Sequence, residues 1–158
     1  MQRQHLADKT AARLSALSGG LTDGKPLDGP SGLDLRLMIW RLVDAAVTGT
    51  LQIDDTHDMA LIGNVVLHAH AEHVAVSHYY SIGPSTAYAT AYGSATAWNS
   101  IVTAIRARHV ETGKIGVSGN EYQALRKAAE YLHNWYGEQP RAKIARAYRA
   151  AIDQASAV

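Results

Sequence analysis

The chain has 158 residues, of which 47% are apolar and 18% are charged, and it contains no cysteine and no phenylalanine. This length and apolar fraction are typical of one globular domain and exclude a disordered tail. The absence of cysteine excludes disulfide bonds, thiolate metal sites and a cysteine nucleophile. A formal net charge of +1 argues against a uniformly basic nucleic-acid-binding domain.

The first residues carry charges every few positions and no apolar run like that of a secretory signal, so we expect a cytoplasmic protein. Residues 73–105 contain no Asp, Glu, Lys or Arg and are long enough to span a bilayer. Their histidines, hydroxyl groups and Asn99 would each be costly in hydrocarbon, which favours a buried helix pair and no membrane partner.

Three segments are distinguished at the domain level. Residues 1–20 are predicted to contain a short peripheral helix, over residues 4–17. Residues 21–32 are rich in glycine and proline and are predicted to form a loop, and residues 33–158 form a single helical domain. The domain begins with a core-facing helix over residues 33–47, whose apolar residues have helical spacing: Leu35, Met38, Ile39, Leu42 and Val43.

Residues 57–80 and 86–108 are predicted to form a central antiparallel helical hairpin joined by a turn at residues 81–85. The stretch Asp54-Asp55-Thr56 before the first of these helices, and Ser85 before the second, are each expected to supply an N-cap. Residues 65–76 also alternate in polarity as a strand would. Alanine and glutamate are poor strand formers, so helix is favoured.

The second helix of this hairpin carries a regular seam, in which residues recur at alternating spacings of four and three. The seam consists of Ala87, Ala91, Ser94, Trp98, Ile101 and Ile105. Such a seam faces a partner helix. That partner lies either within the chain or in a second copy, so the seam is also a candidate homo-oligomer interface.

Two further helices are predicted near the C-terminus. Ser118 and Glu121 match a capping box at the start of the first. Pro140 opens the second, whose predicted buried side consists of Ile144, Tyr148, Ala151 and Ala155. We expect these helices to form a C-terminal αα-hairpin. The complete fold is predicted to be an all-α, compact bundle of five or six helices.

Nine of the 15 Lys and Arg residues lie between Arg106 and the end of the chain, and none lies between Leu42 and Ile105. Six of them on the two C-terminal helices are predicted to form one basic face: Arg126, Lys127, Arg141, Lys143, Arg146 and Arg149. Guanidinium groups make two-point, charge-assisted hydrogen bonds, so this face suits an acidic protein surface or nucleic acid. A solvated face of amphipathic helices is the simpler interpretation.

Four histidines and Glu72 lie within residues 68–78. His70 and His73 are one helical turn apart and could bind zinc or iron together with a third ligand from elsewhere in the chain. The spacing does not match the H-E-x-x-H motif or the Glu-x-x-His pairs of di-iron bundles. The alternatives are imidazoles that form hydrogen bonds within or beside the core, and a surface that gains positive charge as pH falls.

The sequence contains no motif that pairs a nucleophile with a base or cradles a phosphate, and this favours a function other than catalysis. The leading hypothesis is a helical adaptor or regulator that binds its partner through the basic face and needs no cofactor. The first alternative is a metal-binding protein or metal-dependent enzyme that uses the histidines from His68 to His78. The second is an oligomeric structural or assembly protein.

Overall fold

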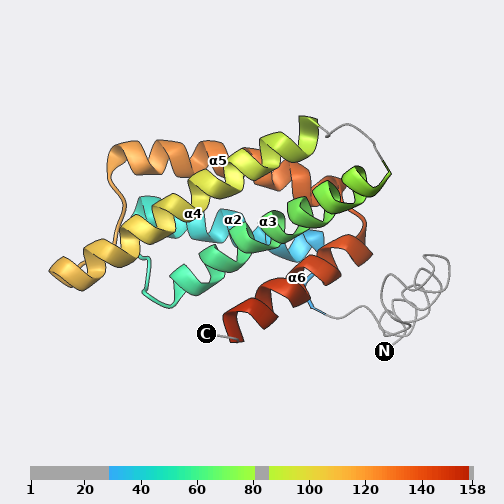
Figure 1. Ribbon diagram of the computed structural model, residues 1–158. Helices are drawn as coiled ribbons and strands as arrows, with labels where there is room; N and C mark the ends of the chain where they lie inside the picture. Colours follow the sequence, from blue (N-terminus) through green and yellow to red (C-terminus); the bar gives the residue numbers. More distant parts are fainter. Residues whose placement is uncertain (1–28, 81–85, 157–158) are drawn as a thin grey trace, which may run out of the picture.

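Figure 1 shows the computed structural model of the chain, which describes residues 29–80 and 86–156. These residues form five helices and no strand, so the predicted all-α bundle is confirmed, with helix over residues 65–76. The helices are α2 (Gly32–Thr48), α3 (Asp55–Tyr79), α4 (Thr86–Thr112), α5 (Gly119–Glu138) and α6 (Arg141–Ser156). The predicted helix over residues 4–17, most of the loop over residues 21–32, and the turn with its cap at Ser85 lie outside the described residues.

Capping boxes fix the first residues of two helices. The predicted box before α5 is confirmed: Glu121 N donates to Ser118 Oγ at 3.1 Å, and Ser118 N donates to Glu121 Oε1 at 2.8 Å. The same reciprocal pair is formed by Ser31 and Asp34 at the start of α2, although Ser31 was predicted to lie in a loop. Each box satisfies backbone donors that a helix start leaves without partners.

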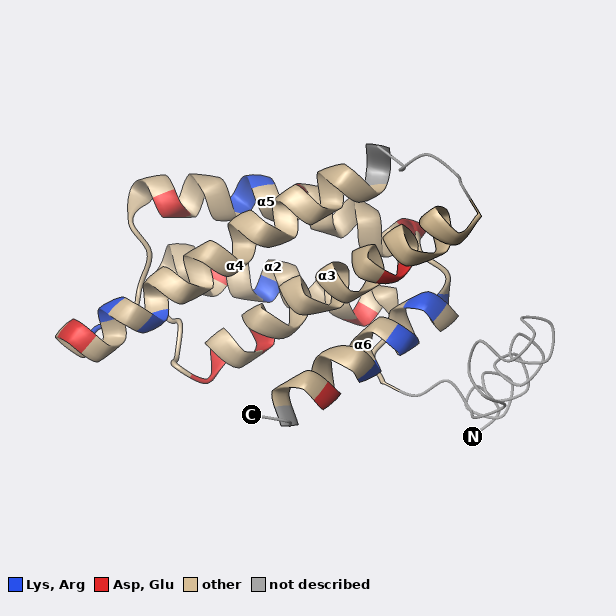
Figure 2. Ribbon diagram, in the orientation of Figure 1, with Lys and Arg blue, Asp and Glu red and all other residues tan. Residues whose placement is uncertain are grey.

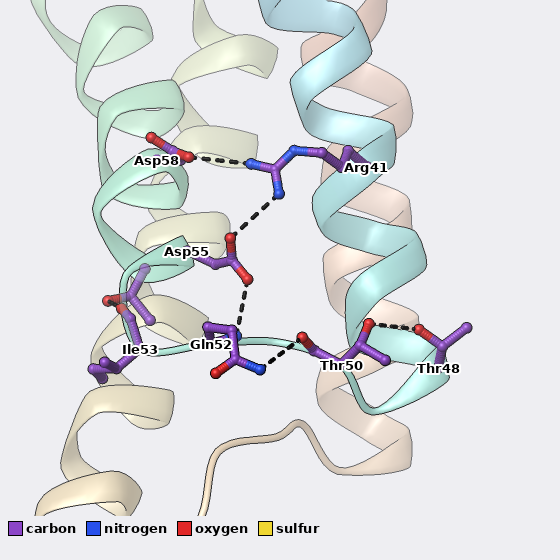
Figure 3. Close-up of polar contacts among 8 residues, drawn as sticks. Arg41, Thr48, Thr50, Gln52, Ile53, Asp55 and Asp58 are labelled. Atoms are coloured by element: carbon purple, nitrogen blue, oxygen red, sulfur yellow. Dashed lines mark hydrogen bonds and ion pairs between the residues drawn. The ribbon is translucent and has the colours of Figure 1, made fainter.

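The connection between α2 and α3 is fixed by ionic and polar contacts rather than by the expected N-cap. Asp54 makes no capping hydrogen bond with its side chain. Instead, the Asp55 carboxylate accepts a hydrogen bond from Gln52 N at 2.9 Å (Figure 3). Arg41 of α2 bridges Asp55 and Asp58, at N–O distances of 3.3 and 3.1 Å. The acidic start of α3 is thereby held against α2.

Helix α3 lies between α4 and α6 and packs against both (Figure 1). Helices α3 and α4 lie side by side and run in opposite directions. Helix α5 packs against α4 and α2, on the side of the bundle opposite α6. Because α5 and α6 do not pack along each other, the predicted C-terminal αα-hairpin is not formed. The apolar side of α6 is covered by α3 instead.

The core is organised around two aromatic side chains that donate hydrogen bonds to the backbone of α3. Trp98 of α4 is fully buried, and its Nε1 donates to Met59 O at 2.7 Å. The hydroxyl of Tyr136 on α5 donates to Ile62 O at 2.6 Å. The predicted core-facing side chains are buried or half-buried, with one exception: Ala155 near the end of α6 is exposed.

Helix α4 carries many hydroxyl groups on its exposed side. Thr96, Ser100 and Thr103 each donate a hydrogen bond to the carbonyl oxygen four residues earlier. Such bonds satisfy the hydroxyl groups within the helix itself.

None of the five described helices is both long enough and apolar enough to cross a lipid bilayer.

Candidate functional site

The six cations of the predicted basic face lie on two helices on opposite sides of the bundle (Figure 2). Arg126 and Lys127 are on α5, which packs on α4 and α2, and the other four are on α6, which packs on α3. The six residues therefore do not form the single surface that the sequence predicted. Amphipathic spacing shows which side of each helix faces water, but not where the two helices lie relative to each other.

Two of the α6 cations contact neighbouring helices. Arg146 forms a two-point ion pair with Glu72 of α3, with Nε 3.1 Å from Oε2 and Nη2 bonded to the second carboxylate oxygen. The Lys143 ammonium donates to the Tyr88 hydroxyl and lies 4.7 Å from the centre of the Tyr88 ring. These two side chains tie α6 to α3 and α4. Among the six predicted cations, Arg126, Lys127 and Arg141 are exposed.

His70 and His73 both point toward α4, where the ring of His73 stacks on Tyr88 and that of His70 is tilted against Tyr92. The rings of His73 and Tyr88 are 3.8 Å apart and nearly parallel, and those of His70 and Tyr92 are 4.5 Å apart. Burial lowers the pKa of His73, and nearby Lys143 and His70 lower it further. Within the described residues, no three His, Asp or Glu side chains come together as a metal site requires. The third ligand that the zinc or iron hypothesis needs is thus missing from this part of the chain.

The predicted oligomer seam lies largely inside the single chain. Ala91, Trp98, Ile101 and Ile105 are buried in the core, and Ser94 is half-buried. The side chain of Ala87 is outside the described residues. The partner helices that the seam faces are therefore helices of the same chain, and its buried apolar atoms are not accessible to a second copy.

A groove that was not predicted from the sequence runs beside the seam, between α4 and α5. Its volume is about 390 Å³, and it is lined by Ala89, Thr90, Gly93, Ser94, Ala97, Ala124, Lys127, Ala128 and Tyr131. Most of these side chains are small, so the facing surfaces of the two helices leave space between them. Lys127 and Tyr131 are exposed at this groove. The signal in the sequence is the recurrence of small residues every four positions on α4.

His133 of α5 joins α5 to α2 through two side chains. Trp40 Nε1 donates to His133 Nδ1 at 2.9 Å, and Arg36 Nε approaches the same nitrogen at 3.3 Å. Nδ1 must carry a lone pair to accept these bonds, so the contact requires neutral imidazole. Burial lowers the pKa of His133, and the positive charge of Arg36 lowers it further.

We expect the free energy of unfolding to fall as the pH drops below about 6.5. An unfolded histidine takes up a proton near pH 6.5. Folded His133 and His73, whose pKa values are lowered, take up theirs only at lower pH. The unfolded state therefore binds more protons in this window, and stability decreases with falling pH. Urea unfolding at about pH 7.5 and about pH 5.5 measures the difference.

The variant His133→Gln should reduce this pH dependence, because glutamine can accept the Trp40 hydrogen bond without titrating. The same substitution at His78, which is exposed near the end of α3, is the matched control. An unchanged pH dependence in His133→Gln would show that other groups dominate the acid response.

In comparisons with known proteins, no protein-family model, no curated protein and no solved structure matches the chain.

Proposed function

We propose that this protein is a non-enzymatic helical binding protein that receives an acidic, amphipathic helix of a partner protein in the α4–α5 groove. The observation that supports this most is the groove itself, where small side chains on both walls adjoin an exposed lysine and an exposed tyrosine. The proposal keeps the acidic partner expected from the sequence. It moves the contact surface from the α6 cations to the groove beside Lys127.

The shape of the groove suits a helix. A methyl group added at Gly93 would meet no atom within 4 Å, so the α4 backbone is open to an approaching chain there. Small residues let the ridge of side chains on another helix enter between α4 and α5. Tyr131 is 45% exposed and offers an aromatic anchor of the kind that contributes strongly to protein interfaces.

Charge favours an acidic helix over nucleic acid as the occupant. Lys127 is the only charged residue among the described residues that line the groove. Its neighbour Arg126 lies 3.9 Å from Glu130 on the same helix, so its charge is partly balanced. Nucleic acid is bound through many phosphate contacts to a row of cations. A single lysine beside an apolar floor fits a partner that has one apolar and one acidic side.

The test uses a synthetic helical peptide with leucine on one side and glutamate on the other, titrated into the full chain. We expect salt-sensitive binding that shifts the amide signals of Lys127 and Tyr131. Lys127→Glu should weaken binding by about three- to tenfold, because it replaces attraction by repulsion at the edge of an interface. Lys114→Glu makes the same charge change at an exposed position away from the groove and is the matched control. Gly93→Leu should abolish binding by filling the groove.

Three results would overturn the proposal. The first is absence of peptide binding at millimolar concentration, or equal binding of a lysine-faced peptide. The second is tighter binding of duplex DNA with the same loss in Lys127→Glu, which would make nucleic acid the partner. The third is self-association that disappears in Gly93→Leu, which would make a second copy of the chain the occupant.

A further inference from the structure

A second groove lies between α3 and α6 and shares no residue with the α4–α5 groove. Its volume is about 460 Å³, which is in the range of small-molecule sites. Leu61 of α3 and Ile152 of α6 contribute apolar surface. Asn64, Arg106 and Tyr148 contribute polar groups. The groove therefore offers surface for a molecule that has both an apolar and a polar part.

Arg106 is the one Lys or Arg side chain among the described residues that line this groove. It reaches from α4 to the first turn of α3, where Nε donates to Thr56 Oγ1 at 3.1 Å and Nη2 donates to Thr56 O at 3.2 Å. Thr56 is 1% exposed, so these two bonds hold the guanidinium against a buried anchor. Across residues 29–80 and 86–156, no carboxylate lies within ion-pair distance of Arg106. A half-buried cation without a counter-ion is favourable to an anionic ligand.

The neighbours of Arg106 add donors without cancelling its charge. Asp58 also lines the groove, but its carboxylate forms an ion pair with Arg41 of α2 at 3.1 Å (Figure 3). The Oδ1 atom of Asn64 accepts a hydrogen bond from Asn99 Nδ2 at 3.0 Å. The N–H donors of Asn64 are therefore directed away from that bond. Arginine and amide donors beside an apolar wall complement a carboxylate with a hydrocarbon body.

We propose that the α3–α6 groove binds a small aliphatic carboxylate, with its carboxylate on Arg106 and Asn64 and its hydrocarbon chain against Leu61 and Ile152. A guanidinium matches a planar carboxylate through two parallel hydrogen bonds. Arg106 keeps Nη1 and one hydrogen of Nη2 for this purpose, because Thr56 occupies only Nε and the other Nη2 hydrogen. This site does not depend on the helix-binding function proposed for the α4–α5 groove.

Octanoate is the probe, and octanamide, which has the same shape without the charge, is the matched ligand control. Both are titrated into the full chain by calorimetry and by amide NMR. We expect octanoate to shift signals along the first half of α3 and the second half of α6. Arg106→Gln should weaken octanoate binding by about tenfold or more, because it removes charge-assisted hydrogen bonds. Arg141→Gln removes one exposed arginine outside the groove and should leave the affinity unchanged.

A second variant keeps the test decisive if Arg106→Gln unfolds. Ile152 is 40% exposed, so Ile152→Glu should fold, and it places a negative charge on the apolar wall. We expect it to weaken octanoate binding by about tenfold as well. The proposal is overturned if octanoate does not bind at millimolar concentration, if octanamide binds equally well, or if the shifted signals lie outside the groove. Equal affinity of octanoate for the wild type and Ile152→Glu would also overturn it.

Discussion

Replacement of Trp98 by alanine is expected to lower the free energy of unfolding by about 3–5 kcal/mol. Trp98 is fully buried where α4 packs on α3, and it is the largest of the fully buried side chains. The substitution leaves a cavity and removes the hydrogen bond from Nε1 to Met59 O. Urea unfolding followed by circular dichroism measures the change.

Trp98→Phe keeps one aromatic ring and removes the N–H donor together with part of the indole volume, so its loss should be smaller than that of Trp98→Ala and larger than that of the hydrogen bond alone. The hydrogen bond alone should contribute about 1 kcal/mol. Tyr136→Phe removes the corresponding bond to Ile62 O and should have an effect of similar size. A loss below about 1 kcal/mol for Trp98→Ala would contradict the central position of this side chain in the core.

The variant Gly63→Ala is expected to destabilise the protein by about 1–3 kcal/mol, although alanine is the better helix former. A methyl group at Gly63 would lie 2.7 Å from Cγ and 3.0 Å from Nδ2 of Asn99, and closer still to Oδ1. The Asn99 amide cannot simply rotate away, because its Nδ2 donates to Asn64 Oδ1. The close approach of α3 and α4 at this point thus requires glycine.

Gly93→Ala is the matched control, because Gly93 is also a mid-helix glycine but has open space where the methyl group would be. It should stabilise the protein by about 0.5–1 kcal/mol through helix propensity alone. The double variant of Gly63→Ala with Asn99→Ala should recover most of the loss, since the smaller side chain relieves the clash. If Gly63→Ala and Gly93→Ala were equally stable, the tight α3–α4 contact would be disproved.

The helices could be predicted from the sequence because their signals are local. The capping box at Ser118 and the helical spacing of Leu35, Ile39 and Leu42 depend on residues only a few positions apart. The packing of α6 could not be predicted in the same way. The apolar side of α6 could pack on any apolar surface of similar shape. Nothing within residues 141–156 indicates that this side is covered by α3 rather than by α5.

The two grooves could not be predicted either, because they depend on how helices that are distant in sequence pack together. The α4–α5 groove is a space between two rows of small residues, and its sequence signal is the same as that of ordinary close packing. Arg106 and Thr56 are 50 positions apart and meet only because α3 and α4 pack side by side. The predicted basic face failed for the converse reason. Its residues are near one another in sequence, but they lie on separate sides of the bundle.

The position of α3 between α4 and α6 also affects how the chain folds as it is synthesised. Helices α2 to α5 leave the ribosome first and can begin to pack together. The side of α3 that α6 covers stays in water until residues 141–156 have emerged. The nascent chain therefore passes through a stage with an uncovered apolar surface, which chaperones recognise. A ribosome that stalls before α6 is complete would leave a partly folded intermediate prone to aggregation.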